Sequence, residues 1–299
     1  MDMKLVMKMN KNKKAIPILC IFLLLLMPLA VSAQPETPVE EWTGRTILLI
    51  GAHPDDDAQS HGTMAMLQDH GNEVYVLLLT TGNVGTKDPE MTRDRLAKIR
   101  RQEEIDALAE LGIPEDHYIN LGYTDGMMEF ADREEVVKRI VRWIRKLKPT
   151  TLMAFDPGWG YQQWHKTDHR SASYLAADAA RAAEWRLIFP GQIIQEGLEA
   201  HQIQDYLFYS EPEEATNTWV DISDYASNKV RSHSKYISQY TSAWENYTGP
   251  NLEDLPGDEG RKFMERLRRN VFERGLKDGK PHESFRYYKG IPDGIGHRD

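Results

Sequence analysis

Short apolar runs alternate with segments of helical periodicity along the chain after residue 45. Three apolar runs predict strands buried on both faces: residues 45–52, 74–79 and 151–155. Residues 117–121 predict a further short strand. The segments between them predict helices over residues 58–70, 91–111 and 132–147, the last opened by a capping box at 132–135. Such alternation indicates βαβ units. We therefore expect an α/β, Rossmann-like, mostly parallel sheet with helices on both faces.

The remainder of the chain is less regular. Residues 206–209 and 218–220 predict two further strands, and helices are expected near 224–243 and 259–275. No stretch rich in Pro or Ser separates this part from the sheet, which favours one domain over two. We expect a single domain over residues 34–299, with a core at about 45–240 and a C-terminal helical extension.

The first 33 residues form a separate segment. Five Lys lie within the first 14 residues, an apolar run follows to Val31, and the small residues Ser32 and Ala33 come next. This order is typical of a secretory signal peptide, cut here after Ala33. The alternative is an uncleaved anchor, but the run lies at the lower end of the ~17–25 residues that span a membrane. We expect a secreted or periplasmic protein with no stable membrane span after cleavage.

Charge and cysteine content narrow the function classes. The chain has a net charge of −9, which becomes −13 without the leader, so a general nucleic-acid binder is excluded. The one cysteine, Cys20, lies in the leader, so the mature chain has no disulfide, no thiol nucleophile and no thiolate ligand. Any metal would have to be held by His and carboxylate side chains.

The first strand leads directly into a concentrated acidic motif. His53, Asp55, Asp56 and Asp57 lie within five residues, and adjacent carboxylates repel one another unless a cation or protons offset their charge. The alternative is a solvated turn, because Pro-Asp sequences favour turns. Ligands of α/β sheets bind at the carboxyl ends of strands, where this motif lies. A second motif of the same kind at a neighbouring strand end would favour a binding site over a turn.

That second motif follows the fourth strand. His165 and His169 are spaced i, i+4, with Asp168 between them, and such a pair can bind one metal from one helical face. The alternative is a pair of surface or core histidines. Because both motifs lie at strand ends of one predicted sheet, we expect them to meet. Two imidazoles and a carboxylate form a typical catalytic zinc set with an open position for water.

Together these motifs resemble one known family. Ala52-His-Pro-Asp-Asp56 followed by His165-x-x-Asp168-His169 is similar to the PIG-L/LmbE-like N-acetylglucosaminyl deacetylases, over roughly residues 45–240. Weaker matches are Thr80-Thr81-Gly82, Arg100-x-x-Glu103, the segment 121–126 and Ile237-Ser238-Gln239. The resemblance implies a zinc-dependent deacetylase, with one Zn²⁺ per chain, that acts on N-acetylated sugars or glycans.

The resemblance also implies individual roles. His53, Asp56 and His169 would bind the metal, and Asp55 would be the general base. His165 would stabilise the tetrahedral intermediate or help the amine leave, with Asp168 orienting it. Arg100 and Asp125 would contact the substrate. Beyond the resemblance, Trp164 directly precedes His165, and we expect its ring to stack on a sugar of the substrate.

Two positions depart from the family pattern. Asp57 stands where the family usually has Glu, and Tyr236 stands where it usually has His. They favour one alternative to a secreted sugar deacetylase, a non-catalytic glycan-binding relic of the fold. A second alternative, within the same chemistry, is a hydrolase of another amide, such as an amino-sugar conjugate. The sequence does not indicate the sugar, its linkage or the oligomeric state.

Overall fold

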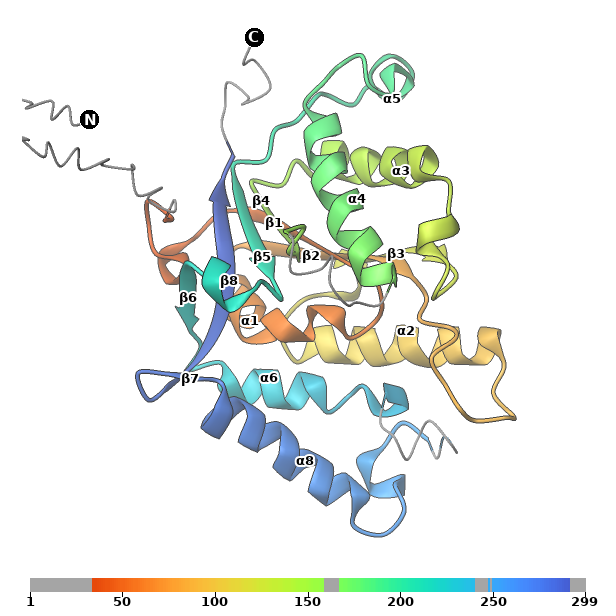
Figure 1. Cartoon of the computed structure of the whole chain (residues 1–299), viewed down its shortest axis with the longest axis vertical. Helices are drawn as coiled ribbons and strands as arrows, with labels where there is room; N and C mark the ends of the chain where they lie inside the picture. Colours follow the sequence, from red (N-terminus) through yellow and green to blue (C-terminus); the bar gives the residue numbers. More distant parts are fainter. Residues whose placement is uncertain (1–33, 159–166, 240–246, 248, 291–299) are drawn as a thin grey trace, which may run out of the picture. The chain divides into compact units, whose positions relative to one another are not determined.

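A computed structural model describes residues 34–158, 167–239, 247 and 249–290. Its central feature is a sheet in the order β3-β2-β1-β4-β5-β8-β6, with β7 paired to β8 (Figure 1). The strands are β1 (Thr46–Gly51), β2 (Glu73–Thr80), β3 (Tyr118–Tyr123), β4 (Thr151–Phe155), β5 (Asp205–Tyr209), β6 (Thr218–Asp221), β7 (Leu276–Lys277) and β8 (Lys280–Lys289). The first five pair in parallel, which confirms the expected Rossmann-like fold.

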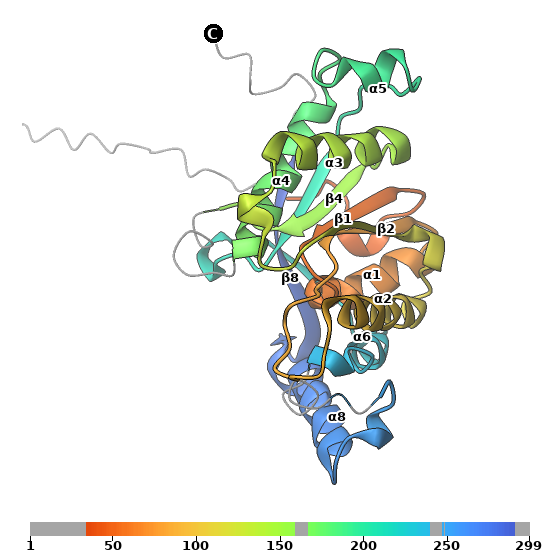
Figure 2. The ribbon, with the colours of Figure 1, turned by 90° about the vertical axis from the view of Figure 1, so that its right-hand side faces the viewer.

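Helices cover both faces of the sheet, as Figure 2 shows for α3 and α4 on one side and α1 and α2 on the other. Their bounds are α1 (His61–Asp69), α2 (Arg93–Ala109), α3 (Arg133–Leu147), α4 (Thr167–Ala183), α5 (Pro190–Ile194), α6 (Ala226–His233) and α8 (Glu259–Arg269). β1 lies between β2 and β4 in the sheet, and a helical layer covers each face. All its residues from Ile47 to Gly51 are therefore buried. This accounts for its unbroken apolar sequence.

Local sequence sets the helix ends. Asp132 caps α3 by accepting a 3.0 Å hydrogen bond from the backbone N–H of Glu135. Val136, Ile140 and Ile144 of α3 are buried at helical spacing, so the apolar stripe seen in the sequence faces the sheet. Among the helices in the described part of the chain, none is long and apolar enough to cross a bilayer.

The C-terminal part differs from the sequence expectation in two ways. The helix expected near 224–243 ends at His233 as α6, and a 3₁₀ turn, η7 (Ile237–Gln239), follows. Glu103 of α2 fixes this turn, because its carboxylate accepts hydrogen bonds from Ser238 N at 2.7 Å and Ser238 Oγ at 2.6 Å.

The second difference is the strand β8, where only a helical extension was expected. The extension does contain α8, followed by the π-helical turn η9 (Asn270–Arg274), but the chain then returns to the sheet. β8 inserts between β5 and β6 and is antiparallel to both. Its buried positions Glu283, Phe285 and Tyr287 alternate with more exposed ones, and abundant charge masks this alternation in the sequence.

Candidate active site

The predicted site lies at the topological switch point of the sheet. Successive strands run outward from β1 through β2 to β3, whereas β4 and β5 lie on the other side of β1. Ligands of open α/β sheets bind outside the carboxyl ends of the strands at such a point. β1 leads directly to His53, and α4, which follows β4, carries His169. The two sequence motifs therefore meet where the fold provides a crevice.

His53, Asp56 and His169 form a compact donor set, as the sequence predicted. One potential ligand atom from each lies within 4.8 Å of the other two. Asp56 Oδ1 is 3.0 Å from His169 Nε2, and Asp56 Oδ2 is 3.2 Å from His53 Nδ1. The backbone N–H groups of Ala52 and His53 donate to Asp56 Oδ2 at 3.0 and 2.7 Å. These bonds hold the carboxylate in place between the two imidazole rings.

Asp125 and Asp168 lie on the other side of the His53 ring. His53 Nε2 is 3.0 Å from Asp125 Oδ1 and 3.2 Å from Asp168 Oδ2. The imidazole therefore has carboxylates on both sides, because its Nδ1 faces Asp56. Metal-binding histidines commonly donate their other ring N–H to a carboxylate. A metal bound at Nδ1 would leave Nε2–H to be accepted by Asp125 or Asp168, and His53, Asp125 and Asp168 themselves form a second group of potential ligand atoms.

The electrostatics of the donor set suit a divalent cation. Burial alone would raise the pKa of Asp56, but the neighbouring His53 and His169 imidazoles hold it well below its usual range. Burial opposes a charged His53, yet Asp56, Asp125 and Asp168 raise its pKa well above the ordinary value. The surrounding carboxylates therefore require positive charge in this crevice. Two imidazoles and one carboxylate match the ligands of catalytic zinc sites, so the residues present fit such a metal.

Asp55, the predicted general base, has an unusual backbone conformation. Its φ of 109° lies in a region that non-glycine residues rarely adopt. Strained residues of this kind occur where the surrounding structure fixes them, often at functional sites. The strain separates the side chains of two consecutive acids. Asp56 turns inward to the buried histidines, and Asp55 lines an open cavity beside them.

This cavity has a volume of about 490 Å³, enough for a sugar ring with its acetamido group. Besides His53, Asp55 and Asp168 it is lined by Val84, Gly85, Thr86, Lys87, Arg100, Asp125, Gly126, Thr167 and Gln239. Sequence reasoning missed Thr86 and Lys87, since nothing distinguishes them from an ordinary polar loop. Gln239 could have been found from the sequence, because it belongs to the Ile237-Ser238-Gln239 match to the family pattern.

Arg100 lines the cavity, but its N–H groups are largely engaged within the protein. The guanidinium donates to the carbonyl oxygens of Gly82 and Gly85 and, at 2.9 Å, to Gln239 Oε1. Its Nη1 lies 3.8 Å from Asp125 Oδ2. Arg100 thus fixes the loop after β2 and the η7 turn around the cavity. Its contact with substrate stays a prediction.

Two predicted residues, His165 and Trp164, lie outside the described part of the chain. The predicted orientation of His165 by Asp168 therefore stays a prediction. The structure gives Asp168 two further partners, because its carboxylate accepts the N–H of Gly126 at 2.7 Å and that of Met128 at 3.0 Å. Asp168 thus joins α4 to the segment after β3, as well as contacting His53.

The two departures from the family pattern belong to one buried network behind the loop. Asp57 Oδ2 is 2.8 Å from His61 Nε2, and His61 Nδ1 is 2.7 Å from Ser232 Oγ. Tyr236 Oη donates to Glu104 Oε2 at 3.1 Å. Burial, and then the nearby Asp57 carboxylate, raise the pKa of Glu104 well above its usual value, so this buried group links the surroundings of Asp57 and Tyr236. Neither departure removes a side chain from the cavity lining.

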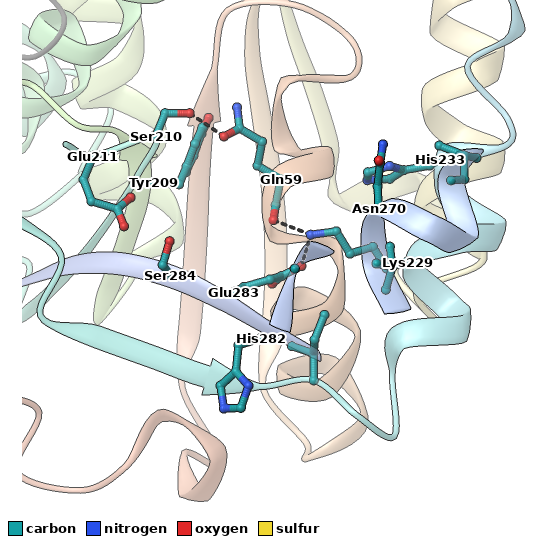
Figure 3. A pocket seen from close by; sticks show the side chains of 14 residues that line it. Gln59, Tyr209, Ser210, Glu211, Lys229, His233, Asn270, His282, Glu283 and Ser284 are labelled. Carbon is teal, nitrogen blue, oxygen red and sulfur yellow. Dashed lines mark hydrogen bonds and ion pairs between the residues drawn. The ribbon is translucent and has the colours of Figure 1, made fainter. Parts of the chain in front are cut away.

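A second cavity, of about 390 Å³, lies between β8, α6 and η9 (Figure 3). Two charged groups of its lining, Lys229 and Glu283, form an ion pair. Glu283 accepts from Lys229 Nζ at 2.5 Å and from the N–H groups of Gly62 and Thr63 in the first turn of α1. Lys229 also donates to Gln59 O at 2.7 Å. We assign these contacts a structural role: β8 caps the helix that follows the His53–Asp56 loop.

Comparison with known proteins agrees with this geometry. A family model described as PIG-L, GlcNAc-PI de-N-acetylase, matches residues 48–180. Diacetylchitobiose deacetylase of Thermococcus kodakarensis is 36% identical over 203 residues, covering 67% of this chain and 73% of that protein. A 1D-myo-inositol 2-acetamido-2-deoxy-alpha-D-glucopyranoside deacetylase of Catenulispora acidiphila is 28% identical over 291 residues, covering 80% of this chain and 88% of that protein.

The fold agrees as well. N,N'-diacetylchitobiose deacetylase from Pyrococcus horikoshii superposes with a TM-score of 0.68 at 27% identity, covering 84% of this chain and 86% of that one. The α/β sheet with its His and Asp set therefore defines a deacetylase. The chain belongs to the PIG-L family, which confirms the resemblance carried by the two sequence motifs. It is a metal-dependent amide hydrolase, and the interpretation as a non-catalytic relic is not supported.

Proposed function

We propose that this chain is a secreted, zinc-dependent deacetylase that removes acetyl groups from N-acetylated amino sugars. The observation that carries the proposal is the His53–Asp56–His169 set at the switch point, next to a cavity of about 490 Å³ that Asp55 lines. His and carboxylate ligands without thiolates favour zinc as a catalytic Lewis acid. The leader over residues 1–33 supports secretion, since its composition follows the order of a signal peptide.

The residues of the chain suit amide hydrolysis. A zinc ion held by this set would polarise the acetyl carbonyl and lower the pKa of water at its open position. Asp55 accepts a proton from the attacking water, because its strained backbone keeps it in the cavity beside the metal ligands. With a metal bound at Nδ1, Asp125 and Asp168 would accept the Nε2–H of His53 and so fix the orientation of its ring.

The substrate class follows from relatives and cavity together. The Thermococcus relative is named for diacetylchitobiose and the Catenulispora relative for an N-acetylglucosamine joined to inositol. Both substrates carry an acetamido group on glucosamine. Secretion favours an extracellular glycan over an intracellular conjugate, so we propose an N-acetylglucosamine oligosaccharide as substrate.

Acetate release from a panel of sugars tests the function. We expect zinc-loaded protein to release acetate from N-acetylglucosamine and, more efficiently, from diacetylchitobiose. The panel includes the inositol-linked sugar, because preference for it would favour the alternative of an amino-sugar conjugate. Metal analysis of the purified protein should find about one zinc per chain. Protein that binds zinc but releases acetate from none of these sugars would refute the proposal.

A further inference from the structure

The carbonyl group of Pro54 is bound by a side chain from a distant part of the chain. Gln239, which lies 185 residues further on, donates its Nε2–H to Pro54 O at 3.1 Å. The next carbonyl, that of Asp55, is held within the turn itself, where it accepts the N–H of Ala58 at 3.1 Å. Hydrogen bonds therefore fix the peptide groups both before and after Asp55.

The bond from Gln239 bears directly on the backbone angle φ of Asp55. A peptide group is planar, so the direction of the Pro54 carbonyl fixes the plane that ends at the Asp55 nitrogen. The angle φ is the rotation from that plane about the N–Cα bond, and its value of 109° is unfavourable for a residue with a Cβ. Loss of the bond from Gln239 would let φ relax, and the Asp55 carboxylate would shift with it.

The amide of Gln239 is itself oriented by Arg100. A guanidinium group has only donors, so the amide atom that it faces at 2.9 Å is the oxygen Oε1, which turns Nε2 toward Pro54. Arg100 is buried and donates to two backbone carbonyls of the loop after β2. The backbone is fixed as well, because the carboxylate of Glu103 accepts two hydrogen bonds from the preceding residue, Ser238. Gln239 therefore reaches the metal loop from a rigid support.

Resting on the proposed function, we infer that Gln239 is a positioning residue that holds Asp55, the general base, in its catalytic orientation. A general base has to lie within hydrogen-bond reach of the proton that it accepts, and small displacements of reacting groups cost rate. Strained residues persist only where the surrounding structure holds them. Gln239 does this through the backbone of Pro54, so its contribution belongs in kcat rather than in KM.

Kinetics of two Gln239 variants test this role. Gln239→Met keeps about the same length and volume but has no N–H, so kcat for diacetylchitobiose should fall roughly threefold to tenfold, about the worth of one hydrogen bond. KM should change less than about twofold, with zinc content unchanged. Gln239→Glu keeps an oxygen for Arg100 but, as a carboxylate, cannot donate to Pro54, so kcat should fall by a similar factor.

Gln192 provides a matched control. It accepts a hydrogen bond from Arg145 Nη1 at 3.0 Å and donates Nε2–H to Lys138 O at 2.8 Å, which is the same pair of bonds outside the cavity lining. Gln192→Met should lower stability and leave kcat unchanged. A fall in kcat that equals the one in Gln239→Met would show that the loss of such a bond acts only through general destabilisation, and would overturn the proposal.

Coupling to Asp55 separates positioning from other roles. In an Asp55→Asn background, Gln239→Met should change the residual kcat less than about twofold, because the group that it positions no longer accepts the proton. An equal loss of kcat in both backgrounds would overturn the proposal, as would normal kcat in Gln239→Glu. A raised KM with unchanged kcat would do the same, because Gln239 would then serve to contact the substrate.

Crystal structures provide a readout that does not depend on turnover. The Asp55 carboxylate should be displaced in Gln239→Met, with φ moved from the value near 109° to the ordinary negative range. An Asp55 with the same φ and the same carboxylate position in variant and wild type would overturn the proposal. If the wild-type protein releases acetate from none of the sugars, the proposed function fails, whereas this comparison still tests the hold of Gln239 on Asp55.

Discussion

The phenol of Tyr236 donates a hydrogen bond to Glu104 Oε2 at 3.1 Å, and the Asp57 carboxylate lies close enough to Glu104 to raise the pKa of that carboxyl group further above the value that burial gives it. The two positions that depart from the family pattern are thus joined through one buried carboxyl group. Asp57 is one methylene shorter than the usual Glu, and Tyr236 reaches further than the usual His. We interpret them as a compensating pair that keeps the interior behind the metal loop filled and hydrogen-bonded.

Compensation predicts non-additive stability. Asp57→Glu overpacks a fully buried site, and Tyr236→His leaves Glu104 without its donor, so each change should cost about 1–3 kcal/mol of unfolding free energy. The double variant should recover at least about 1 kcal/mol of the sum, as measured by urea unfolding. Tyr225→Phe is the control, since Tyr225 makes a similar bond to Asp69 at the surface. Additive losses would contradict the pairing.

Metal content should distinguish the two histidines of the second motif. His169→Ala removes a residue of the donor set, so the purified variant should contain little zinc and show no activity. His165→Ala should keep the metal while activity collapses, because the family resemblance assigns His165 to the reaction, whereas His169 lies with His53 and Asp56 in the donor set of the described residues. Mass spectrometric metal analysis and acetate release measure the two effects separately. Zinc loss in His165→Ala would show that this ligand assignment is wrong.

Asp55→Asn should separate chemistry from binding. The amide has nearly the size of the carboxylate but cannot accept the proton from water. We expect zinc to be retained and kcat to fall roughly 10²–10⁴-fold, the usual contribution of general acid–base catalysis. Asp178→Asn, an exposed change on the far side of α4, should leave kcat unaltered. Near-normal turnover in Asp55→Asn would assign the proton transfer to another group.

Glu103 should make stability depend on pH. Burial raises its pKa from the ordinary 4.5 to about 7, although Ser238 donates two hydrogen bonds to it. A raised carboxyl pKa means that the folded state holds the proton more tightly, so its stabilising contribution is complete below pH 4.5 and is lost as pH rises through 7. Relative to Glu103→Gln, the wild-type protein should lose at most about 3 kcal/mol between pH 4 and 8. Urea unfolding at several pH values measures this dependence. A difference in unfolding free energy between the two proteins that stays constant from pH 4 to 8 would contradict the raised pKa.

Apolar patterning was enough to predict the parallel half of the sheet. β1, β2 and β4 are buried on both faces, so their sequences contain a signal that needs no tertiary information. β8 could not be found in this way, because its buried Glu283 reads as a surface residue and is neutralised only by Lys229 and the N-terminus of α1. Those partners lie far away in the sequence.

The residues of the site likewise fall into those that sequence motifs predict and those that depend on the tertiary path of the chain. The spacing of His53, Asp56 and His169 in their two motifs, placed at strand ends, predicted residues that the fold does bring together. The contact of Asp125 with His53 is different, since it depends on the path of the chain after β3.

The position of β8 determines the order in which the sheet can be completed. β6 precedes β8 by about 60 residues, yet it pairs with β8 and reaches β5 only through it. During synthesis, β1 to β5 can pair as soon as they are made. β6 has no strand to pair with until β8 has been synthesised. The Glu283 cap on α1 arrives equally late. The loop that binds the metal is therefore made among the first residues of the domain but is secured among the last.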